Sequence, residues 1–418
     1  MTTFEESGAS TAEDPAVSRW LFVHDHHFVP CDDFIGSRSG FGAKLWERYL
    51  PYCDAITVIG REGAPAPREE LIVSSRESVE FRLLPDRGRG LARLRAFAEA
   101  RVILEQVIAT HDVVIARVPS VLGLMAISIA RRMGKPVAVE AVGCAWSAMW
   151  DHGSAAGKAF APIHWRQMRK AVGRADNVIY VTENFLQDRY PTRAQNISNA
   201  SNVELPPSDI IEGQPTLDRA TLTKRLKRIE CAVQGELRLG LVGSLRVRSK
   251  GIQFVLPALK SLKRCDRPFS FHVLGAGDAR PWIEEAKRHG VADLVTFHGS
   301  LPEGQAVFDW LDHIDIYLQP SLQEGLPRAL IEAMSRGCPA IGSNCAGIPE
   351  LLDERMVVPM RDVDALLQRI LALMADSDEM ARQAMRNFKT AHAYLSPTLA
   401  ERREAFFRKV QAQSLGQL

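Results

Sequence analysis

The feature of this sequence that most constrains its fold is an alternation of short apolar runs with longer amphipathic runs, which occurs twice. The first series extends from Arg19 to about residue 205, and the second restarts near residue 236. Between them, residues 206–235 are polar, charged and proline-containing, and the alternation lapses. Strands that alternate with helices form parallel sheets with helices on both faces. The sequence therefore predicts an α/β protein with two Rossmann-like domains whose parallel sheets face a central cleft.

The length of the chain and the break in the alternation predict how it is organised. A chain of 418 residues exceeds the size of one ordinary hydrophobic core, so two domains are expected. The first residues are polar and acidic and lack a charged-then-apolar signal sequence, which is typical of a disordered tail. The predicted organisation is a disordered tail over residues 1–18, an N-terminal domain over 19–205, a linker over 206–235, a C-terminal domain over 236–390, and a C-terminal helix over 391–418 that packs back toward the N-terminal domain.

The composition argues against several classes of protein. The formal net charge is +2, so nothing in the total charge requires a nucleic-acid partner, and none is expected. The seven cysteines are scattered without a Cys-x-x-Cys pair, which argues against a disulfide framework and a zinc site and favours a reducing cytoplasm. The longest apolar run, Val118 to Ala130, is too short to cross a bilayer core of roughly 30 Å and is predicted to be a buried helix. We therefore expect a cytoplasmic globular protein.

Two glutamates eight positions apart form the strongest motif. Glu324 follows the predicted strand IDIYLQ, and Glu332 lies in a predicted helix that starts at Pro327 and ends at Gly337. The free N–H groups in the first turn of that helix make an anion site at the carboxyl edge of the sheet. Carboxylates repel phosphates, so hydroxyl-rich groups such as ribose and a sugar are their expected partners. The alternative is that Glu332 belongs to a hydrogen-bond network inside an ordinary amphipathic helix.

A basic cluster precedes another predicted helix. The segment LVGSLRVRSKG, residues 241–251, predicts a strand, a glycine turn at Gly243 and a cluster of cations. Lys250 stands at the predicted start of the next helix, where its charge and the helix dipole together would hold a phosphate. An exposed basic loop without a ligand is the alternative.

These motifs, in this order, resemble those of glycosyltransferase family 4, a large family of retaining enzymes with the GT-B fold. The resemblance covers roughly residues 19–400. The segments HDHHF, VEAVGCAWSAMWDHG and VIYVTENFLQDRYP further resemble glycosyltransferases of capsular and exopolysaccharide assembly. In that family the first glutamate of the motif contacts the transferred sugar and the second holds the ribose, which implies these roles for Glu324 and Glu332. The resemblance also implies that the backbone N–H groups of Gly325 and Leu326 contact the diphosphate.

The cationic part of the implied donor site departs from the family pattern. Family members usually have Gly-Arg-Leu followed by Lys-Gly. Gly243 and Lys250 match this pattern, but Ser244 stands at the position of the arginine. Arg246 or Arg248 could supply the missing cation, or the hydroxyl of Ser244 could bind a phosphate oxygen.

Two further loops are implied to approach the donor through their backbones. The segment LVTFHGSLP resembles the family segment that lines the nucleotide base, so backbone groups near Phe297 and Gly299 are expected to contact base edges. Gly40 and Gly42 match a glycine-rich loop near the diphosphate and the acceptor, where close approach of the backbone favours glycine. A plain turn is the alternative for the second loop.

The acceptor side is expected on the N-terminal domain. His24 and His26 stand at the end of the first predicted strand, where they could bind hydroxyl groups, hold a metal or serve only the structure. Family members often have a histidine where Val142 stands, so the usual histidine contact to the sugar is missing. Glu140, on the same face of its predicted strand, or the later Asp151 and His152 could replace it.

The resemblance as a whole implies a cytoplasmic hexosyltransferase. Such an enzyme moves a sugar from a nucleotide-diphosphate sugar to a saccharide or lipid-linked saccharide acceptor, here in bacterial surface or exopolysaccharide assembly. Neither a metal nor another cofactor is expected, so Lys250 and helix N-termini would stabilise the leaving diphosphate as the anomeric bond breaks. A nucleotide-sugar epimerase of the same fold and a catalytically silent carbohydrate-binding scaffold are the alternatives.

An arginine-rich segment predicts contact with a membrane. The stretch from Arg82 to Ile103 contains six arginines interspersed with apolar residues. Each cation near an anionic membrane surface contributes about 1 kcal/mol, so this segment is predicted to hold the protein peripherally on the inner face of the plasma membrane. The alternative is that Leu94 and Phe97 pack in the core while the arginines are simply solvated.

Overall fold

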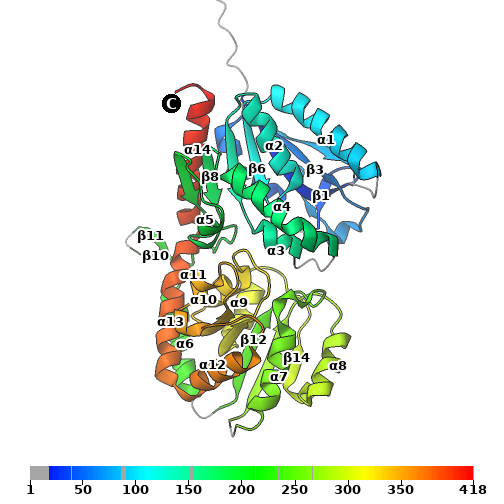
Figure 1. Ribbon diagram of the computed structural model, residues 1–418. Coiled ribbons are helices and arrows are strands. Elements are labelled where there is room, and N and C mark those ends of the chain that lie inside the picture. Colours follow the sequence, from blue (N-terminus) through cyan, green and yellow to red (C-terminus); the bar gives the residue numbers. More distant parts are fainter. Residues whose placement is uncertain are drawn as a thin grey trace, which may run out of the picture. The chain divides into compact units, whose positions relative to one another are not determined.

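The computed structural model describes residues 18–38, 40–85, 91–150, 155–211, 213–232, 235–265 and 267–417 (Figure 1). The chain divides into two compact units: unit 1 is residues 1–138 with 407–418, and unit 2 is residues 139–406. Parallel strands alternate with helices along the chain and form two sheets, which confirms the predicted α/β class. The domain limits predicted from the sequence stay a prediction.

The strands of unit 1 are β1 (Arg19–Pro30), β2 (Ile35–Ser37), β3 (Ala55–Glu62), β4 (Ile72–Val73), β5 (Val79–Leu84) and β6 (Val113–Val118). β1 pairs in parallel with β3 on one side and with β6 on the other, and β5 extends the sheet beyond β3. The short strands β2 and β4 pair in antiparallel fashion near the end of β1. Residues 20–23 of β1 and all of β6 are buried, as expected for near-continuous apolar strands covered on both faces.

The helical elements of unit 1 are η1 (Ala43–Arg48), η2 (Leu50–Tyr52), η3 (Arg68–Glu70), α1 (Leu91–Ala109) and α2 (Val121–Arg132), where η marks a 3-10 helix. The apolar run that begins at Val118 is not one helix, because Val118 ends β6 and α2 begins only at Val121. Ser120 sets this start, since its side chain accepts a hydrogen bond from the N–H of Gly123 at 2.9 Å. From the far end of the chain, Phe407 packs against the rings of Trp20 and Tyr49.

The first part of unit 2 contains β7 (Val137–Ala141, which begins in unit 1), α3 (Ala145–Trp150), α4 (Ala155–Val172), β8 (Asn177–Tyr180), α5 (Phe185–Arg189) and β9 (Asn196–Asn199). The strands follow each other in the order β7-β8-β9. β7 and β8 are buried along their whole length. Their short apolar sequences are therefore confirmed as strands.

The stretch over residues 206–235, where the alternation lapses, contains regular structure. It forms the antiparallel pair β10 (Asp209–Ile211) and β11 (Gln214–Thr216), followed by α6 (Arg219–Ala232). The buried guanidinium of Arg225 in α6 donates to the carbonyl oxygens of Leu311 and Arg336 at 2.9 and 3.1 Å. The charged sequence does not predict this packing. The guanidinium can be buried because carbonyl groups from distant segments accept its hydrogen bonds, and those segments cannot be identified from the local sequence.

The rest of unit 2 is built on a parallel sheet with the order β14-β13-β12-β15-β16-β17. Its strands are β12 (Leu237–Val242), β13 (Phe269–Leu274), β14 (Val295–Phe297), β15 (Ile316–Gln319), β16 (Ala340–Ser343) and β17 (Val357–Val358). The helical elements are η4 (Arg248–Lys250), α7 (Ile252–Leu262), α8 (Arg280–His289), η5 (Ala292–Leu294), α9 (Gln305–Asp312), α10 (Arg328–Ser335), α11 (Ile348–Leu351), η6 (Glu354–Met356), α12 (Val363–Ala375), α13 (Ser377–Ala391), η7 (His392–Tyr394) and α14 (Ser396–Ser414, which ends in unit 1).

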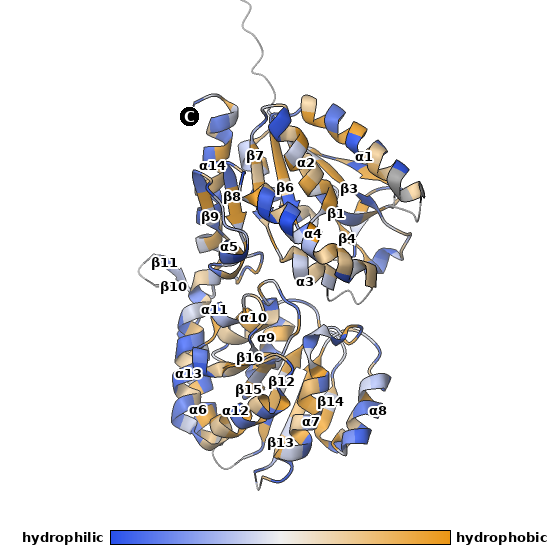
Figure 2. Cartoon of the chain, viewed as in Figure 1, coloured by the Kyte–Doolittle hydropathy of each residue, from blue (hydrophilic) through white to orange (hydrophobic). Residues whose placement is uncertain are grey.

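The connectivity of this sheet locates a binding crevice. The chain builds the sheet outward from β12 in one direction through β13 and β14, and then in the other direction through β15 to β17. The strand order reverses between β12 and β15, and ligands of open α/β sheets bind outside the carboxyl ends of the strands at such a point. Helices pack around the sheet, with α12 against α7 and α13 against α6 and α10, while the strands are largely hydrophobic (Figure 2). Across the part of the chain that the structure describes, no helix is both long enough and apolar enough to span a membrane.

Candidate functional site

The loop that leaves β15 and the helix that follows it have the predicted arrangement. Glu324 lies on the loop after β15, and Glu332 lies in the second turn of α10, which begins directly after Pro327. Gly337 follows the helix with a left-handed φ of 64°, a conformation that favours glycine. Both glutamates therefore lie beside the carboxyl ends of β12 and β15.

Donors from three side chains converge on one oxygen of Glu324. Its Oε1 accepts hydrogen bonds from Lys250 Nζ at 2.7 Å, Ser321 Oγ at 2.8 Å and Gln319 Nε2 at 2.9 Å. Tyr317 orients the amide of Gln319 by donating to its Oε1 at 2.8 Å. Only 8% of the Glu324 side chain is exposed, and no donor among the described residues bonds to its Oε2. The carboxylate is thus held rigidly by one oxygen, and the other remains available to a hydroxyl group.

The residues that support Glu324 lie outside the motifs predicted from the sequence. Tyr317 and Gln319 alternate along β15, and Ser321 follows it, so all three are polar residues at the end of a buried strand. Polar side chains inside a buried strand need hydrogen-bond partners. Their presence at the end of an apolar strand is the sequence feature that could have identified these residues.

Two glycines allow the loop after β12 to approach its neighbours. A Cβ atom on Gly243 would lie 2.6 Å from Cγ of Lys250. Gly251 has a φ of 84°, and a Cβ there would lie 2.0 Å from the carbonyl oxygen of Pro320. Lys250 itself precedes the first residue of α7 by two positions, so it ends the 3-10 helix η4 and lies outside α7. Glycine at these positions is what brings the lysine to Glu324.

Glu332 borders a cavity with an empty volume of about 800 Å³ that opens to solvent. Gly243, Lys250 and Gln319 also line this cavity. Burial raises the pKa of the Glu332 carboxyl above its ordinary value; Arg328 opposes this shift and Glu303 adds to it. No side-chain donor within the described ranges bonds to the Glu332 carboxylate. The hydroxyl of Ser335 donates instead to the backbone carbonyl of Glu332. Such a carboxylate favours a ligand that supplies hydroxyl donors.

The residues that could replace the family arginine have different surroundings. Arg248 forms two hydrogen bonds to the carboxylate of Glu285, at 2.9 and 3.0 Å, and its guanidinium lies 4.9 Å from the centre of the Trp282 ring. Ser244 accepts a hydrogen bond from the N–H of Arg246 at 3.3 Å. The Arg246 side chain has no ion pair in the part of the chain that the structure describes. Arg248 is therefore engaged by α8, whereas the Arg246 side chain has no such partner among the described residues.

The segment expected to contact the base lies beside the same cavity. Phe297 ends β14, and Gly299 has a left-handed φ of 70°. The carbonyl of Gly299 accepts a hydrogen bond from the N–H of Gly275 at 2.6 Å. The next two residues, Ser300 and Leu301, line the cavity. The predicted segment is therefore adjacent to the pocket through residues slightly further along the chain.

Residues outside the predicted motifs contact the Gly325–Leu326 loop. The carbonyl of Gly325 accepts a hydrogen bond from the N–H of Gly347 at 3.0 Å. Three residues further, in α11, the Glu350 carboxylate accepts hydrogen bonds from the N–H groups of Glu183 and Phe185 at 2.7 and 2.5 Å. These contacts hold α11 on one side of the loop.

The end of β7 lies on another side of the same loop. A Cβ atom on Gly325 would lie 3.1 Å from the carbonyl oxygen of Val142, the residue that stands where the family often has histidine. Glu140 lies in β7 two residues earlier and is buried. His152 lies outside the described residues. The roles of Glu140 and His152 stay predictions.

The two predicted histidines belong to unit 1 and are uncharged at neutral pH. His24 Nδ1 lies 3.1 Å from the carbonyl oxygen of Arg117, and His26 Nε2 lies 2.6 Å from Ser37 Oγ. Both rings stack on Phe41. Burial lowers the pKa of His24 to about 4 and that of His26 to about 3. Neutral imidazoles can exchange hydrogen bonds with hydroxyl groups but add no positive charge.

The glycine-rich loop is also part of unit 1. Gly40 has a left-handed φ of 72° and open space around it, and Gly42 precedes η1. A Cβ atom on Gly42 would lie 2.8 Å from Cγ2 of Ile72, so this position is sterically restricted. Within the described residues, no cluster of side chains is suited to hold a metal ion. The proximity of this loop to a donor stays a prediction.

A parallel sheet with a glycine turn, a cationic loop and two carboxylates at its switch point is an arrangement typical of nucleotide-binding α/β enzymes. Residues 236–376, which hold these features, match the family described as glycosyl transferases group 1. The chain is a group 1 glycosyltransferase, of family 4 and the GT-B fold.

Similar proteins match either about a third of the chain or almost all of it. Protein CapJ of Staphylococcus aureus is 29% identical over 375 residues, which cover 90% of this chain and 91% of CapJ. The putative colanic acid biosynthesis glycosyltransferase WcaL of Escherichia coli (strain K12) is 34% identical over 146 residues, which cover 32% of this chain and 35% of WcaL. These relatives connect the chain with glycosyltransferases of polysaccharide biosynthesis.

Solved structures share the fold. HepE of Anabaena in complex with UDP-glucose is 17% identical, with a TM-score of 0.57, and the match covers 96% of this chain and 100% of HepE. The lipopolysaccharide outer core galactosyltransferase WaaB is 14% identical, with a TM-score of 0.63, and the match covers 94% of this chain and 99% of WaaB. At these levels of identity, the two structures confirm the GT-B fold and nothing finer.

Proposed function

We propose that this glycosyltransferase moves a sugar, with retention of anomeric configuration, from a nucleotide-diphosphate sugar to a saccharide or lipid-linked saccharide acceptor. The observation that carries the proposal is the 2.7 Å contact between Lys250 and Glu324 at the edge of a cavity that Glu332 also lines. The name of WcaL, a putative colanic acid biosynthesis glycosyltransferase, supports a role in bacterial surface or exopolysaccharide assembly. The HepE complexes with UDP and UDP-glucose support a uridine diphosphate sugar as the first donor to test.

Each group in the site has a proposed role in donor binding. Glu332 accepts hydrogen bonds from the ribose hydroxyls, and Oε2 of Glu324 accepts one from the transferred sugar. The N–H groups of Gly325 and Leu326 donate to the diphosphate, as helix N-termini commonly do for phosphates. Lys250 and Arg246 supply the positive charge.

The proposed chemistry follows from charge that develops as the anomeric bond breaks. The diphosphate leaves with increasing negative charge while the sugar becomes oxocarbenium-like. Lys250 is already held in position by Glu324, so it stabilises the leaving group without reorganisation. Residues Glu140, His152, His24 and His26 are proposed for the acceptor side. The proposed location is cytoplasmic, with peripheral contact to an anionic membrane.

The test is a donor panel with the purified full-length protein. UDP, GDP and ADP sugars are incubated with and without candidate acceptors, and release of the nucleoside diphosphate is measured together with the glycoside formed. Release of nucleotide and a product that keeps the donor's anomeric configuration support the proposal. An inverted product contradicts retention. Binding of sugar nucleotides without release of nucleotide favours a silent carbohydrate-binding scaffold. Interconversion of the donor sugars favours an epimerase.

A further inference from the structure

We propose that α3 and α4 form a docking surface for an anionic lipid bilayer. The surface consists of Trp150 at the end of α3 and, on α4, the exposed residues Lys158, Phe160, Ile163, Arg166 and Lys170. The proposal rests on the peripheral membrane contact of the proposed function and assigns that contact to a surface that involves neither the donor nor the acceptor residues.

Large apolar side chains of this surface are exposed to solvent. The exposed fraction is 42% for Trp150, 54% for Phe160 and 49% for Ile163. Phe160 and Ile163 are three positions apart and so lie on one face of α4. The opposite face is buried through Ala161, His164 and Met168. α4 therefore packs against the protein with one face and exposes a second apolar stripe to solvent. An exposed apolar stripe of this kind indicates a surface that a partner covers.

The charge around this stripe has a single sign. Residues 155–175 contain the cations Lys158, Arg166, Arg169, Lys170 and Arg174 and no aspartate or glutamate. Arg166 is three positions after Ile163, and Lys170 seven, so both cations flank the exposed apolar residues on the same face. Among the residues that the structure describes, no carboxylate forms an ion pair with these five cations. Figure 2 shows the resulting mixture of hydrophilic and hydrophobic residues along α4.

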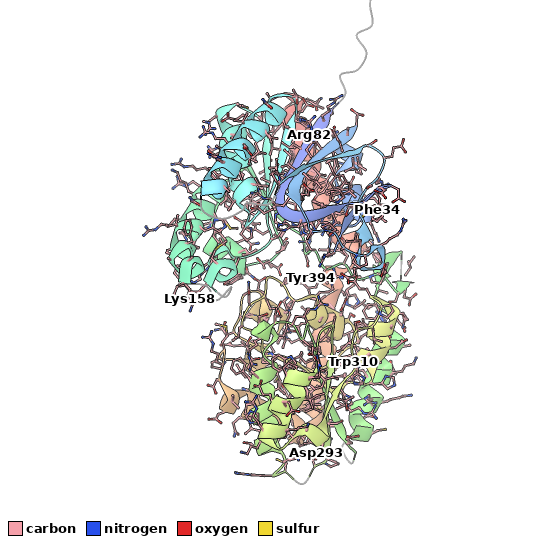
Figure 3. All side chains as sticks on the ribbon, turned by 90° about the vertical axis from the view of Figure 1, so that its right-hand side faces the viewer. Phe34, Arg82, Lys158, Asp293, Trp310 and Tyr394 are labelled. Atoms are coloured by element: carbon pink, nitrogen blue, oxygen red, sulfur yellow. The ribbon has the colours of Figure 1, made fainter. Side chains whose placement is uncertain are left out.

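The tryptophan at the end of α3 fits the same environment. Trp150 stacks on Trp146, with ring centres 5.3 Å apart, and Lys158 Nζ lies 5.9 Å from the centre of the Trp150 ring. Lys158 lies at the molecular surface (Figure 3). Tryptophan and lysine side chains combine an apolar body with a polar end, which suits the boundary between headgroups and acyl chains. An anionic bilayer is the partner that satisfies cations and exposed aliphatic residues together.

The arginine-rich segment predicted from the sequence has a different charge pattern. Arg87 and Arg89 lie outside the described residues. In α1, Arg101 pairs with Glu105 at 3.0 Å, and Arg132 of α2 contacts the same carboxylate at 3.3 Å. Phe97 is 50% exposed, so it does not pack in the core as the alternative for this segment assumed. Acidic residues neutralise part of the positive charge on α1, whereas α4 contains none.

The experiment is co-sedimentation of the full-length protein with vesicles of phosphatidylcholine alone or mixed with phosphatidylglycerol, at low and high salt. One variant carries Phe160→Ser and Ile163→Ser, and a second carries Arg166→Glu and Lys170→Glu. The matched control carries Arg95→Glu and Arg101→Glu, two equivalent charge reversals on exposed positions of α1. Release of nucleotide from a soluble donor shows whether each variant is folded, because none of these residues belongs to the proposed donor site.

The expected result is binding of the wild type to anionic vesicles only, weakened by salt. Both α4 variants are expected to lose about tenfold or more in the partition coefficient, while the α1 control keeps most of its binding. Loss in the control with retention in both α4 variants would overturn the proposal in favour of the arginine-rich segment. Absence of vesicle binding by an active wild type would also overturn it, whatever the outcome for the transfer reaction. Binding of the wild type to an acidic protein or a nucleic acid but not to vesicles would assign α4 another partner.

Discussion

At the scale of single residues, the site is organised by unequal use of carboxylate oxygens. Oε1 of Glu324 accepts hydrogen bonds from Lys250, Ser321 and Gln319, and these bonds fix the direction of Oε2. Glu332 is mostly buried and has no side-chain donor among the described residues, and burial raises its pKa. A buried carboxylate without donors lowers stability until a ligand supplies them. Glu332 is therefore expected to strengthen ligand binding while it lowers the stability of the unliganded protein.

The first prediction concerns nucleotide affinity. Glu332→Ala removes charge-assisted hydrogen bonds to ribose worth about 1.5–3 kcal/mol. The dissociation constant for the nucleotide is expected to rise roughly ten- to a hundredfold, measured by calorimetry on a folded variant. Glu303→Ala, which removes a more exposed carboxylate of the same cavity, serves as the control and is expected to change affinity less. Unchanged affinity in folded Glu332→Ala would show that Glu332 is only part of the helix.

The same carboxylate predicts a dependence of stability on pH. Because the pKa of Glu332 is raised on folding, the folded protein binds this proton more tightly than the unfolded chain does. The stability that it contributes is present at low pH and is lost as the pH rises from the ordinary carboxyl range through the raised pKa. Without ligand, Glu332→Gln is thus expected to melt above the wild type at neutral pH and close to it near about pH 4. A constant difference between the two proteins over that range would contradict the assignment.

The next prediction concerns Lys250. Its contact with the diphosphate should strengthen as the leaving group gains charge, so Lys250→Ala should lower turnover more than donor affinity. We expect a loss in kcat of about a hundredfold or more and a smaller change in the dissociation constant of the donor. Lys263→Ala, which removes a surface lysine paired with Asp293, is the control and should change neither. An equal loss in both quantities would argue for ground-state binding alone.

At the scale of elements, the site depends on two loops that are far apart in sequence and adjacent in the sheet. The contact from Lys250 to Glu324 joins residues 74 positions apart, because β12 and β15 are neighbours. The loop after β12 carries the cations, and the loop after β15 carries the glutamate and the start of α10. Leu322 also donates its N–H to the carbonyl of Ser249 at 2.7 Å. The two loops consequently behave as one unit.

The first element-scale prediction separates the arginines of the β12 loop. Arg246→Ala is expected to weaken donor binding about tenfold, because its guanidinium is free to contact the diphosphate at Ser244. Arg248→Ala is the matched control, since that guanidinium is engaged by Glu285 and Trp282. It should lower the melting temperature slightly and leave donor affinity almost unchanged. The reverse outcome in a titration with donor would mean that Arg248 leaves Glu285 when the donor binds.

The second element-scale prediction concerns the close approach at Gly251. Alanine in a left-handed conformation costs about 1–2 kcal/mol, and Gly290→Ala should show this cost alone, because a Cβ there meets open space. Gly251→Ala adds an overlap with the carbonyl of Pro320, for which a further 1–3 kcal/mol or so is expected. Gly251→Ala should therefore melt well below Gly290→Ala and bind donor less tightly. Equal melting temperatures for the two variants would show that the loop relaxes freely.

At the scale of the whole molecule, the donor and the proposed membrane partner are assigned to different parts of unit 2. The donor residues lie at the carboxyl edge of the parallel sheet that starts with β12, whereas the apolar and basic surface lies on α3 and α4. The similarity to CapJ covers 90% of this chain, so it extends well beyond residues 236–376, which match the family model. The vesicle experiment and the donor panel therefore test separate properties, and either result stands without the other.

The sequence by itself determined what depends on local spacing. Alternating apolar runs identified the strands and helices, and Pro327 with Gly337 placed the helix that carries Glu332. The order of the motifs identified the family. These features could be predicted because strand and helix periodicity and helix boundaries are encoded within a few residues.

The tertiary structure alone decided what depends on contacts between distant segments. It placed three donors on one oxygen of Glu324, directed Arg248 to Glu285, and packed α6 through Arg225 where the sequence suggested a loose linker. It also left one face of α4 exposed. The physical reason is that a charged or apolar side chain has the same local pattern whether its partner is solvent or another element, and only packing selects between the two.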